Sequence, residues 1–212
     1  MSAALADMTP GFRDAVHGAQ LTFRSVLNAM ARPGLIAELP AAAVEGIVPP
    51  ASSDDLQPMG LASTALMLAL LDAECGVRLV GRLASAAAVA YLRFHTGVSA
   101  VGETADFTLA RAGDVDAQLW SRLHLGSDNE PQRGATLVIE VSGLGRAAGT
   151  RLQLRGPGIQ DVQPLMVSGL SHEFWLWRQC LQAALPRGID LILVEGVRVA
   201  AVPRSSRITL EA

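Results

Sequence analysis

Two short apolar runs near the C-terminus constrain the fold of this chain more than any other feature. Residues 191–194 and 197–202 are separated by Glu195-Gly196, a spacing that predicts two antiparallel strands joined by a tight turn in which glycine supplies a positive φ. The first run is almost wholly apolar, which is typical of a strand buried on both faces, deep in a sheet. Pro186 and Pro203 bound the hairpin, because proline cannot donate a hydrogen bond to a sheet.

Predicted helices and strands alternate along the rest of the chain. Apolar periodicity, turn residues and the cap signals Ser85 and Ser171 define them. Helices are expected over residues 12–31, 59–73, 85–95, 114–123 and 170–185, and strands over residues 35–39, 77–80, 106–110, 136–141 and 150–154. Residues 40–58 contain four prolines and are expected to form a loop. This alternation predicts the α/β class, with one domain over residues 1–212, a mixed β-sheet flanked by helices and flexible residues 1–10.

The first predicted helix has a regular apolar face. Thr9 is the expected N-cap, and the Arg32-Pro33-Gly34 sequence is expected to end the helix. Apolar side chains recur along it at spacings of three and four, so they share one face that we expect to pack against the core. These residues are Phe12, Val16, Ala19, Phe23, Leu27 and Met30.

The composition excludes several kinds of site. All 17 basic residues are arginine, so no lysine is present to hold pyridoxal phosphate as a Schiff base or to grip a phosphate in a P-loop. The four histidines have no metal-ligand spacing, and Cys75 and Cys180 form no metal motif. We therefore expect no cofactor and no metal. No catalytic motif is recognisable either.

Charge and hydropathy bear on partners and location. The net charge of −3 offers no overall attraction for nucleic acid. The longest apolar stretch, residues 65–71, is far shorter than the roughly 20 residues of a transmembrane helix. The N-terminus lacks the pattern of a signal peptide. The cytoplasm is therefore the expected location.

Two short motifs combine guanidinium and hydroxyl groups that suit the binding of an oxyanion. Arg93, His95 and Thr96 stand at an expected helix end, and Arg204 and Ser205 follow the last strand of the hairpin. The alternative is structural: His95 and Thr96 would satisfy the last helical carbonyls, and Arg204 would lie at a solvated strand end. The residues alone leave both interpretations open.

Several short runs resemble the PhnH family, and they occur in the same order along residues 12–208. Members of this family are subunits of the bacterial carbon–phosphorus lyase system, which degrades phosphonates. The runs are residues 23–30, 32–34, 70–72, 92–97, 134–139, 154–159, 186–193 and 202–206. The family often has Pro-Arg-Thr-Thr where this chain has Pro-Arg-Ser-Ser at residues 203–206, a difference that keeps both hydroxyls.

The resemblance implies a fold like that of pyridoxal-phosphate-dependent transferases, without the cofactor. It also implies a homodimer in isolation and assembly with the PhnG, PhnI and PhnJ subunits. With ATP and PhnL, this system attaches the phosphonate to the 1-position of a ribose triphosphate and displaces adenine (the α-D-ribose 1-methylphosphonate 5-triphosphate synthase reaction). Cluster ligands for the later radical step are not evident here.

Two functional hypotheses follow. The first is a required subunit of the enzyme complex with no catalytic residues and no independent activity. The second is a subunit that binds the phosphonate or ATP itself, through Arg93, His95, Thr96, Arg204 and Ser205. Both predict that Arg204→Ala leaves the fold intact.

Overall fold

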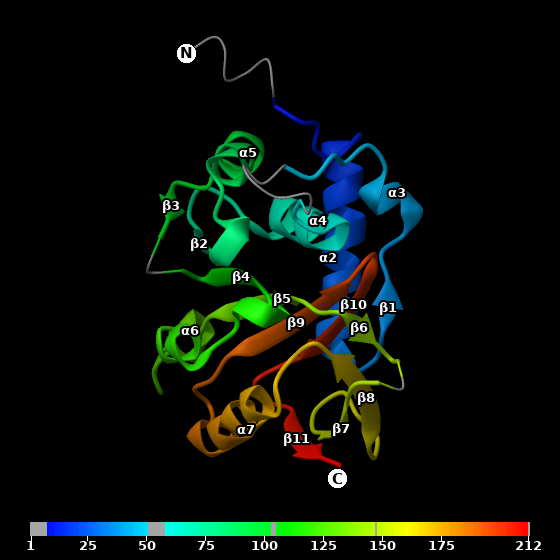
Figure 1. Ribbon diagram of the computed structural model, residues 1–212, viewed down its shortest axis with the longest axis vertical. Coiled ribbons are helices and arrows are strands. Elements are labelled where there is room, and N and C mark those ends of the chain that lie inside the picture. Colours follow the sequence, from blue (N-terminus) through cyan, green and yellow to red (C-terminus); the bar gives the residue numbers. More distant parts are fainter. Residues whose placement is uncertain (1–7, 51–57, 103–104, 147, 212) are drawn as a thin grey trace.

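A seven-stranded mixed sheet runs through the centre of the protein (Figure 1). The computed structural model describes residues 8–50, 58–102, 105–146 and 148–211. The strand order is β1 (Ala37–Glu38), β10 (Arg198–Val202), β9 (Asp190–Glu195), β5 (Thr136–Glu140), β4 (Phe107–Arg111), β2 (Gly76–Leu79) and β3 (Ala100–Val101). The five strands from β9 to β3 are parallel, whereas β10 is antiparallel to both of its neighbours. The predicted mixed sheet is confirmed.

The C-terminal hairpin has the predicted form. β9 and β10 pair antiparallel, and the register joins Glu195 to Arg198. The turn therefore has two central residues, and Gly196 is the first of them, with a φ of +62°. A positive φ at this position is typical of a type II′ turn. Residues 191–194 are buried at every position, as a strand covered on both faces requires.

A second, four-stranded antiparallel sheet was not predicted. Its order is β11 (Arg207–Leu210), β7 (Thr150–Arg155), β8 (Gln163–Ser168) and β6 (Gly143–Leu144). Only β7 was expected from the sequence. β6 has two residues and β8 contains Pro164, so neither shows a run of alternation long enough to predict a strand.

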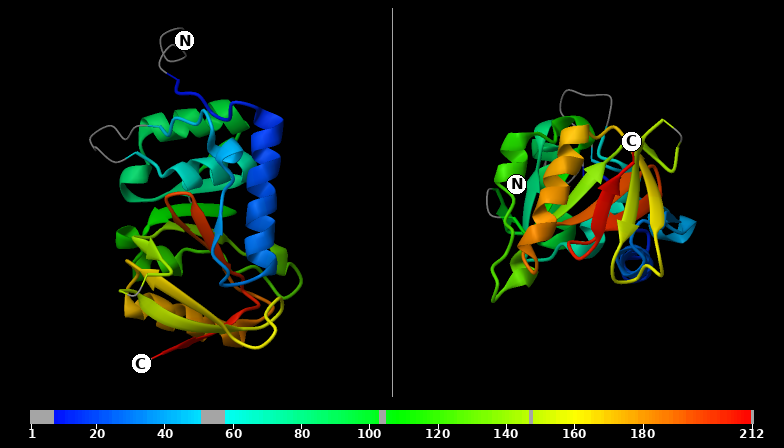
Figure 2. Two further views of the ribbon diagram at one scale, coloured as in Figure 1. Left: turned by 90° about the vertical axis from the view of Figure 1, so that its right-hand side faces the viewer. Right: turned by 90° about the horizontal axis from the view of Figure 1, so that it is seen from below.

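Helices cover both faces of the central sheet, together with the second sheet (Figures 1 and 2). One apolar cluster joins helices α2, α4 and α5 to one face of the central strands, and the other joins α7 and the second sheet to the opposite face. The helices are α2 (Ala15–Ala31), α3 (Ala41–Val44), α4 (Leu61–Leu70), α5 (Ala86–Thr96), α6 (Ala117–Ser121) and α7 (His172–Cys180). None of them, in the part of the chain described, is long and apolar enough to cross a membrane.

The caps of three helices test the predicted boundaries. Ser85 Oγ accepts a hydrogen bond from Ala88 N, and Ser171 Oγ accepts one from Phe174 N, so both predicted N-caps are confirmed. Thr9 does not cap the first helix. Its N-cap is Asp14, whose carboxylate accepts from His17 N at 2.9 Å. The loop expected over residues 40–58 contains α3, and residues 51–57 lie outside the described part.

The predicted core face of α2 is wrong. Val16, Phe23 and Leu27 are 69%, 51% and 56% exposed, although Phe12 and Met30 are packed against the core. The helix instead packs through a narrow set of mostly small residues, which let its backbone approach β10 and α4 closely. This buried set consists of Gly18, Thr22, Val26 and Ala29. A Cβ at Gly18 would lie 2.5 Å from the Phe12 ring, so a larger residue at this position would force that ring to move.

The packing of α5 against the core can be tested through Tyr91, the only tyrosine of the chain. Burial raises the pKa of its phenol to about 12. The folded protein should therefore form tyrosinate only near pH 12, whereas the chain unfolded in urea should do so near pH 10. Because the folded pKa is the higher one, the stability contributed by this group is complete below pH 10 and is lost as the pH rises toward 12. Ultraviolet absorbance of tyrosinate measures both titrations, and titration of the folded protein near pH 10 would contradict the packing.

Candidate functional site

The Arg204 side chain is fully engaged within the protein. Its Nε donates to Asp190 Oδ2 at 3.0 Å and its Nη2 donates to the same oxygen at 2.5 Å. Its backbone N–H donates to Asp190 Oδ1 at 2.7 Å. The remaining donors reach the loop before β5, from Nη1 to the Pro131 carbonyl and from Nη2 to the Gly134 carbonyl at 3.2 Å. This arrangement is a structural clamp rather than a solvated strand end.

Two glycines permit this clamp. A Cβ at Gly134 would lie 2.4 Å from the Gly188 carbonyl oxygen and 2.5 Å from Arg204 Nη1. A Cβ at Gly188 would lie 2.9 Å from the Cβ of Arg204. Both glycines belong to runs that carry the family resemblance, and the close approach of backbone and guanidinium gives a physical reason for them.

A second arginine, which the sequence did not single out, lies at the same turn. Arg178 of α7 is 1% exposed, and its Nη2 donates to the Pro203 and Ser206 carbonyls at 2.7 and 3.1 Å. Burial lowers the pKa of its guanidinium to about 10, against the opposing effect of the Asp190 charge. Within the described residues, its Nε and Nη1, together with Ser206 Oγ and Trp175 Nε1, have no hydrogen-bond partner.

The Arg93 motif lies at the end of α5, where most of its polar groups satisfy backbone. His95 Nε2 lies 3.0 Å from the Thr9 carbonyl, and its ring contacts Tyr91 at 4.4 Å between centroids. Thr96 Oγ1 donates to the Leu92 carbonyl at 2.7 Å and accepts from Val98 N at 3.2 Å. Arg93 itself is exposed.

The structure does not bring the two predicted motifs together. α5 belongs to the cluster on one face of the central sheet, whereas Val202 and Ile208, which flank Arg204 and Ser205, belong to the cluster on the other face. Figure 1 shows α5 and β11 at opposite ends of the molecule. Ser205 is exposed. A single anion site built from both motifs is therefore not formed, and anion binding at either motif alone stays a prediction.

The carboxyl ends of the parallel strands, where open α/β sheets usually bind ligands, carry paired charges. Glu140 accepts from Arg111 Nε at 3.3 Å and from Gly60 N at 2.6 Å. Glu195 pairs with Arg198, and with Arg146 at 2.8 Å. Burial favours a higher pKa for Glu195, but the hydrogen bonds from Leu144 N and Arg198 and the two arginine charges outweigh it and lower the pKa. These pairs fix the loops that leave the sheet.

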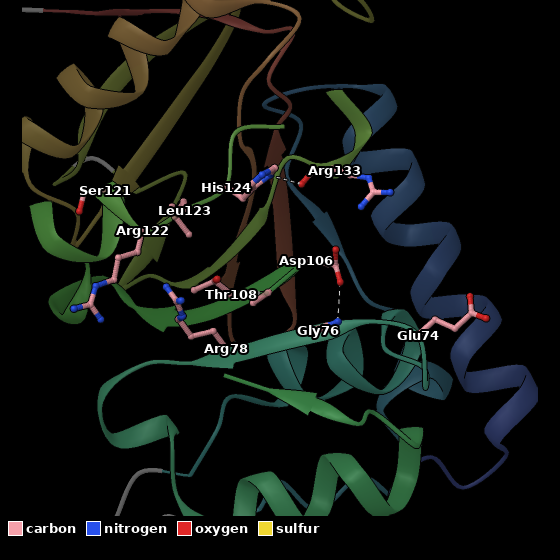
Figure 3. Close-up of a pocket in the computed structure, with 11 residues that line it drawn as sticks. Glu74, Gly76, Arg78, Asp106, Thr108, Ser121, Arg122, Leu123, His124 and Arg133 are labelled. Carbon is pink, nitrogen blue, oxygen red and sulfur yellow. Dashed lines mark hydrogen bonds between the residues drawn. The ribbon is translucent and has the colours of Figure 1, made fainter. Parts of the chain in front are cut away.

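The opposite end of the sheet holds a pocket of about 630 Å³ (Figure 3). Three arginines and a histidine line it together with two carboxylates, which gives a polar cavity with a cationic excess. Its charged and titratable residues are Glu74, Arg78, Asp106, Arg122, His124 and Arg133. No group of three or more potential metal ligands occurs among the described residues.

The family of the chain follows from its similarity to known proteins. The family model described as bacterial phosphonate metabolism protein (PhnH) matches residues 10–209. The chain belongs to the PhnH family. It is 36% identical over 203 residues to the α-D-ribose 1-methylphosphonate 5-triphosphate synthase subunit PhnH of Rhizobium meliloti (strain 1021), a match that covers 94% of each chain.

A second relative of this PhnH-family chain is HtxG of Stutzerimonas stutzeri, which is provisionally assigned as a C-P lyase subunit protein. The two are 44% identical over 113 residues, which cover 53% of this chain and 55% of HtxG. Both relatives are named as subunits, so membership of this family places the chain among proteins that work within assemblies.

The clamp changes the expectation for Arg204→Ala. Removing the guanidinium leaves the mostly buried Asp190 carboxylate without its partner and frees two carbonyls, so the free energy of unfolding should fall by about 3 kcal/mol. Urea denaturation measures this loss. The exposed Arg207→Ala is the matched control and should change stability by less than about 0.5 kcal/mol. Equal stability of the two variants would contradict the clamp and restore the original expectation.

Proposed function

We propose that this chain is an assembly subunit of the carbon–phosphorus lyase system, without catalytic residues of its own. In this role it is required for transfer of phosphonate to the ribose 1-position of ATP with release of adenine. Two features support the proposal: both relatives are named as subunits, and α2 carries an exposed apolar stripe. The stripe is the observation that carries it.

The α2 stripe consists of Val16, Phe23 and Leu27, which are each more than half exposed. Leu27 lies 11 residues after Val16, which at 1.5 Å per residue is about 16 Å along the helix. Large apolar side chains gathered along one helix face are typical of a surface that another chain covers. Polar Arg24 and Asn28 are exposed beside them, as in the rim of a protein interface. We propose that a partner subunit of the assembly covers this stripe.

The proposed partners are those that the family resemblance implies. PhnG, PhnI and PhnJ are the proposed partner subunits, and the isolated chain is proposed to be a homodimer located in the cytoplasm. We also propose a single domain with a fold like that of pyridoxal-phosphate-dependent transferases, without the cofactor. The shared central sheet, with a core cluster on each face, supports one domain. The absence of lysine from the sequence supports the lack of a covalently held cofactor.

The alternative, anion binding through Arg93, His95 and Arg204, has weaker support. The Arg204 donors are engaged by Asp190 and two carbonyls, and the His95 ring meets the Thr9 carbonyl. Of these three, only the exposed Arg93 side chain has no hydrogen-bond or ion-pair partner within the described residues.

A charge placed in the stripe tests the proposed docking surface. Phe23→Glu should weaken co-assembly with PhnG, PhnI and PhnJ at least tenfold, because burying the phenyl ring contributes about 1.5–3 kcal/mol and burying a carboxylate there is unfavourable. Co-purification from cells expressing all four subunits, followed by titration calorimetry, measures the change. Leu176→Glu, at an exposed leucine on the other side of the central sheet, is the matched control and should assemble normally.

Normal assembly of Phe23→Glu would refute the role of the stripe. The size of the isolated variant, measured by light scattering, gives a separate result. A variant that assembles normally but is monomeric in isolation would show that a second copy of this chain, and not another subunit, covers the stripe.

A further inference from the structure

The row of side chains across one face of the central sheet changes from apolar to polar at the pocket. The register aligns Leu191 of β9, Leu137 of β5, Thr108 of β4 and Arg78 of β2. Leu191 and Leu137 lie in the core beneath α7 and the second sheet. Thr108 and Arg78 continue the same row as the floor of the pocket, so this face of β4 and β2 is built from polar groups directly beside an apolar core.

The wall above this floor comes from the end of α6. Trp120 packs edge-on against Phe174 of α7, with ring centroids 5.3 Å apart, and lies 6.1 Å from Trp177. This aromatic contact fixes the end of α6, and the next residues, Ser121 and Arg122, line the pocket together with Arg78. Figure 3 shows the side chains of Arg78, Thr108 and Arg122 gathered at one end of the pocket.

Three other charged residues of the pocket have partners, among them Arg78, whose Nε donates to the Gly102 carbonyl at 3.3 Å. Asp106 accepts a hydrogen bond from Gly76 N at 2.7 Å, and Arg133 pairs with Glu130 at 2.8 Å. The Arg122 guanidinium, by contrast, has no hydrogen-bond or ion-pair partner among the residues that the structure describes. A cation that lacks an acceptor and lies beside a second cation is stabilised when an anion occupies the space between them.

We propose that the Arg78, Thr108 and Arg122 end of this pocket binds an oligophosphate chain, such as the 5′-triphosphate of a nucleotide. The Arg122 guanidinium can donate a pair of parallel hydrogen bonds to phosphate oxygens, and Arg78 of β2 adds a second positive charge to the same pocket. The Thr108 hydroxyl offers a further group at the floor. The volume of about 630 Å³ lies within the range of small-molecule sites.

This inference rests on the proposed function, because the choice of a triphosphate follows from the product named for the Rhizobium relative. The site differs from both sequence motifs, since none of the residues of the Arg93 and Arg204 motifs lines the pocket. It would let an assembly subunit hold the phosphate chain of a substrate while a neighbouring subunit performs the chemistry.

Titration calorimetry of the full-length chain with ATP, inorganic triphosphate and methylphosphonate tests the proposal. ATP and triphosphate should bind, and more weakly as salt increases. Arg122→Gln should weaken the binding of both at least tenfold, and Thr108→Val should weaken it several-fold. Arg207→Gln removes the same charge from β11, outside the pocket, and should bind within twofold of the unaltered chain. Circular dichroism checks that the variants are folded.

Each outcome decides the proposal. No binding of ATP or triphosphate by the unaltered chain overturns it, as does equal weakening by Arg122→Gln and Arg207→Gln, which indicates only general charge attraction. Binding of methylphosphonate without triphosphate overturns the assignment to an oligophosphate. Arg122→Gln should still co-purify with the partner subunits, and Phe23→Glu should still bind ATP, so failure of this site and failure of the α2 docking surface give different results.

Discussion

The ion pair between Asp190 and Arg204 closes the end of the hairpin at which the two strands would otherwise separate. Asp190 is the first residue of β9, and Arg204 lies two residues after the end of β10, so the pair joins the strands at the end away from their turn. The same guanidinium reaches Pro131 and Gly134, which precede β5. One side chain thereby sets the positions of three neighbouring strand ends, from which the central sheet extends.

Arg178 extends this interaction to α7 and the second sheet. It donates to the Pro203 and Ser206 carbonyls, and β11 begins directly after that turn at Arg207. Two guanidiniums and one carboxylate are thus gathered where the two sheets meet. Desolvating these charges is unfavourable, and the four carbonyls that accept from the arginines offset part of that cost. The turn can therefore adopt few alternative arrangements, which suits a junction between two sheets.

The structure separates the roles of its arginines. Arg178 and Arg204 are held by backbone and carboxylate groups and maintain the fold, while Arg111, Arg146 and Arg198 fix loops at the carboxyl ends of the strands. Arg122 alone among the pocket arginines has no acceptor in the described part of the chain. The exposed stripe of α2 lies on a helix that packs against the face of the sheet opposite to the one that carries the pocket. A protein contact and a ligand contact on different elements would let a subunit be bound by its partners without blocking its pocket.

The sequence alone predicted the hairpin, its buried first strand, the Ser85 and Ser171 caps and the α/β class. These features depend on a turn glycine, a cap hydroxyl and apolar runs, each of which acts over only a few residues. It also identified the family, through runs spread along the whole chain.

Tertiary structure decided the rest. Apolar periodicity defines a face of α2 but not its surroundings, so only packing could show that the small face of Gly18 and Thr22 is buried and the Phe23 face is exposed. The sequence around Arg204 is the same whether its partner is a ligand or Asp190, so it could not show which one the guanidinium binds. The row that places Arg78 beside Thr108 arises from pairing between strands 30 residues apart, and no local pattern encodes such a long-range register.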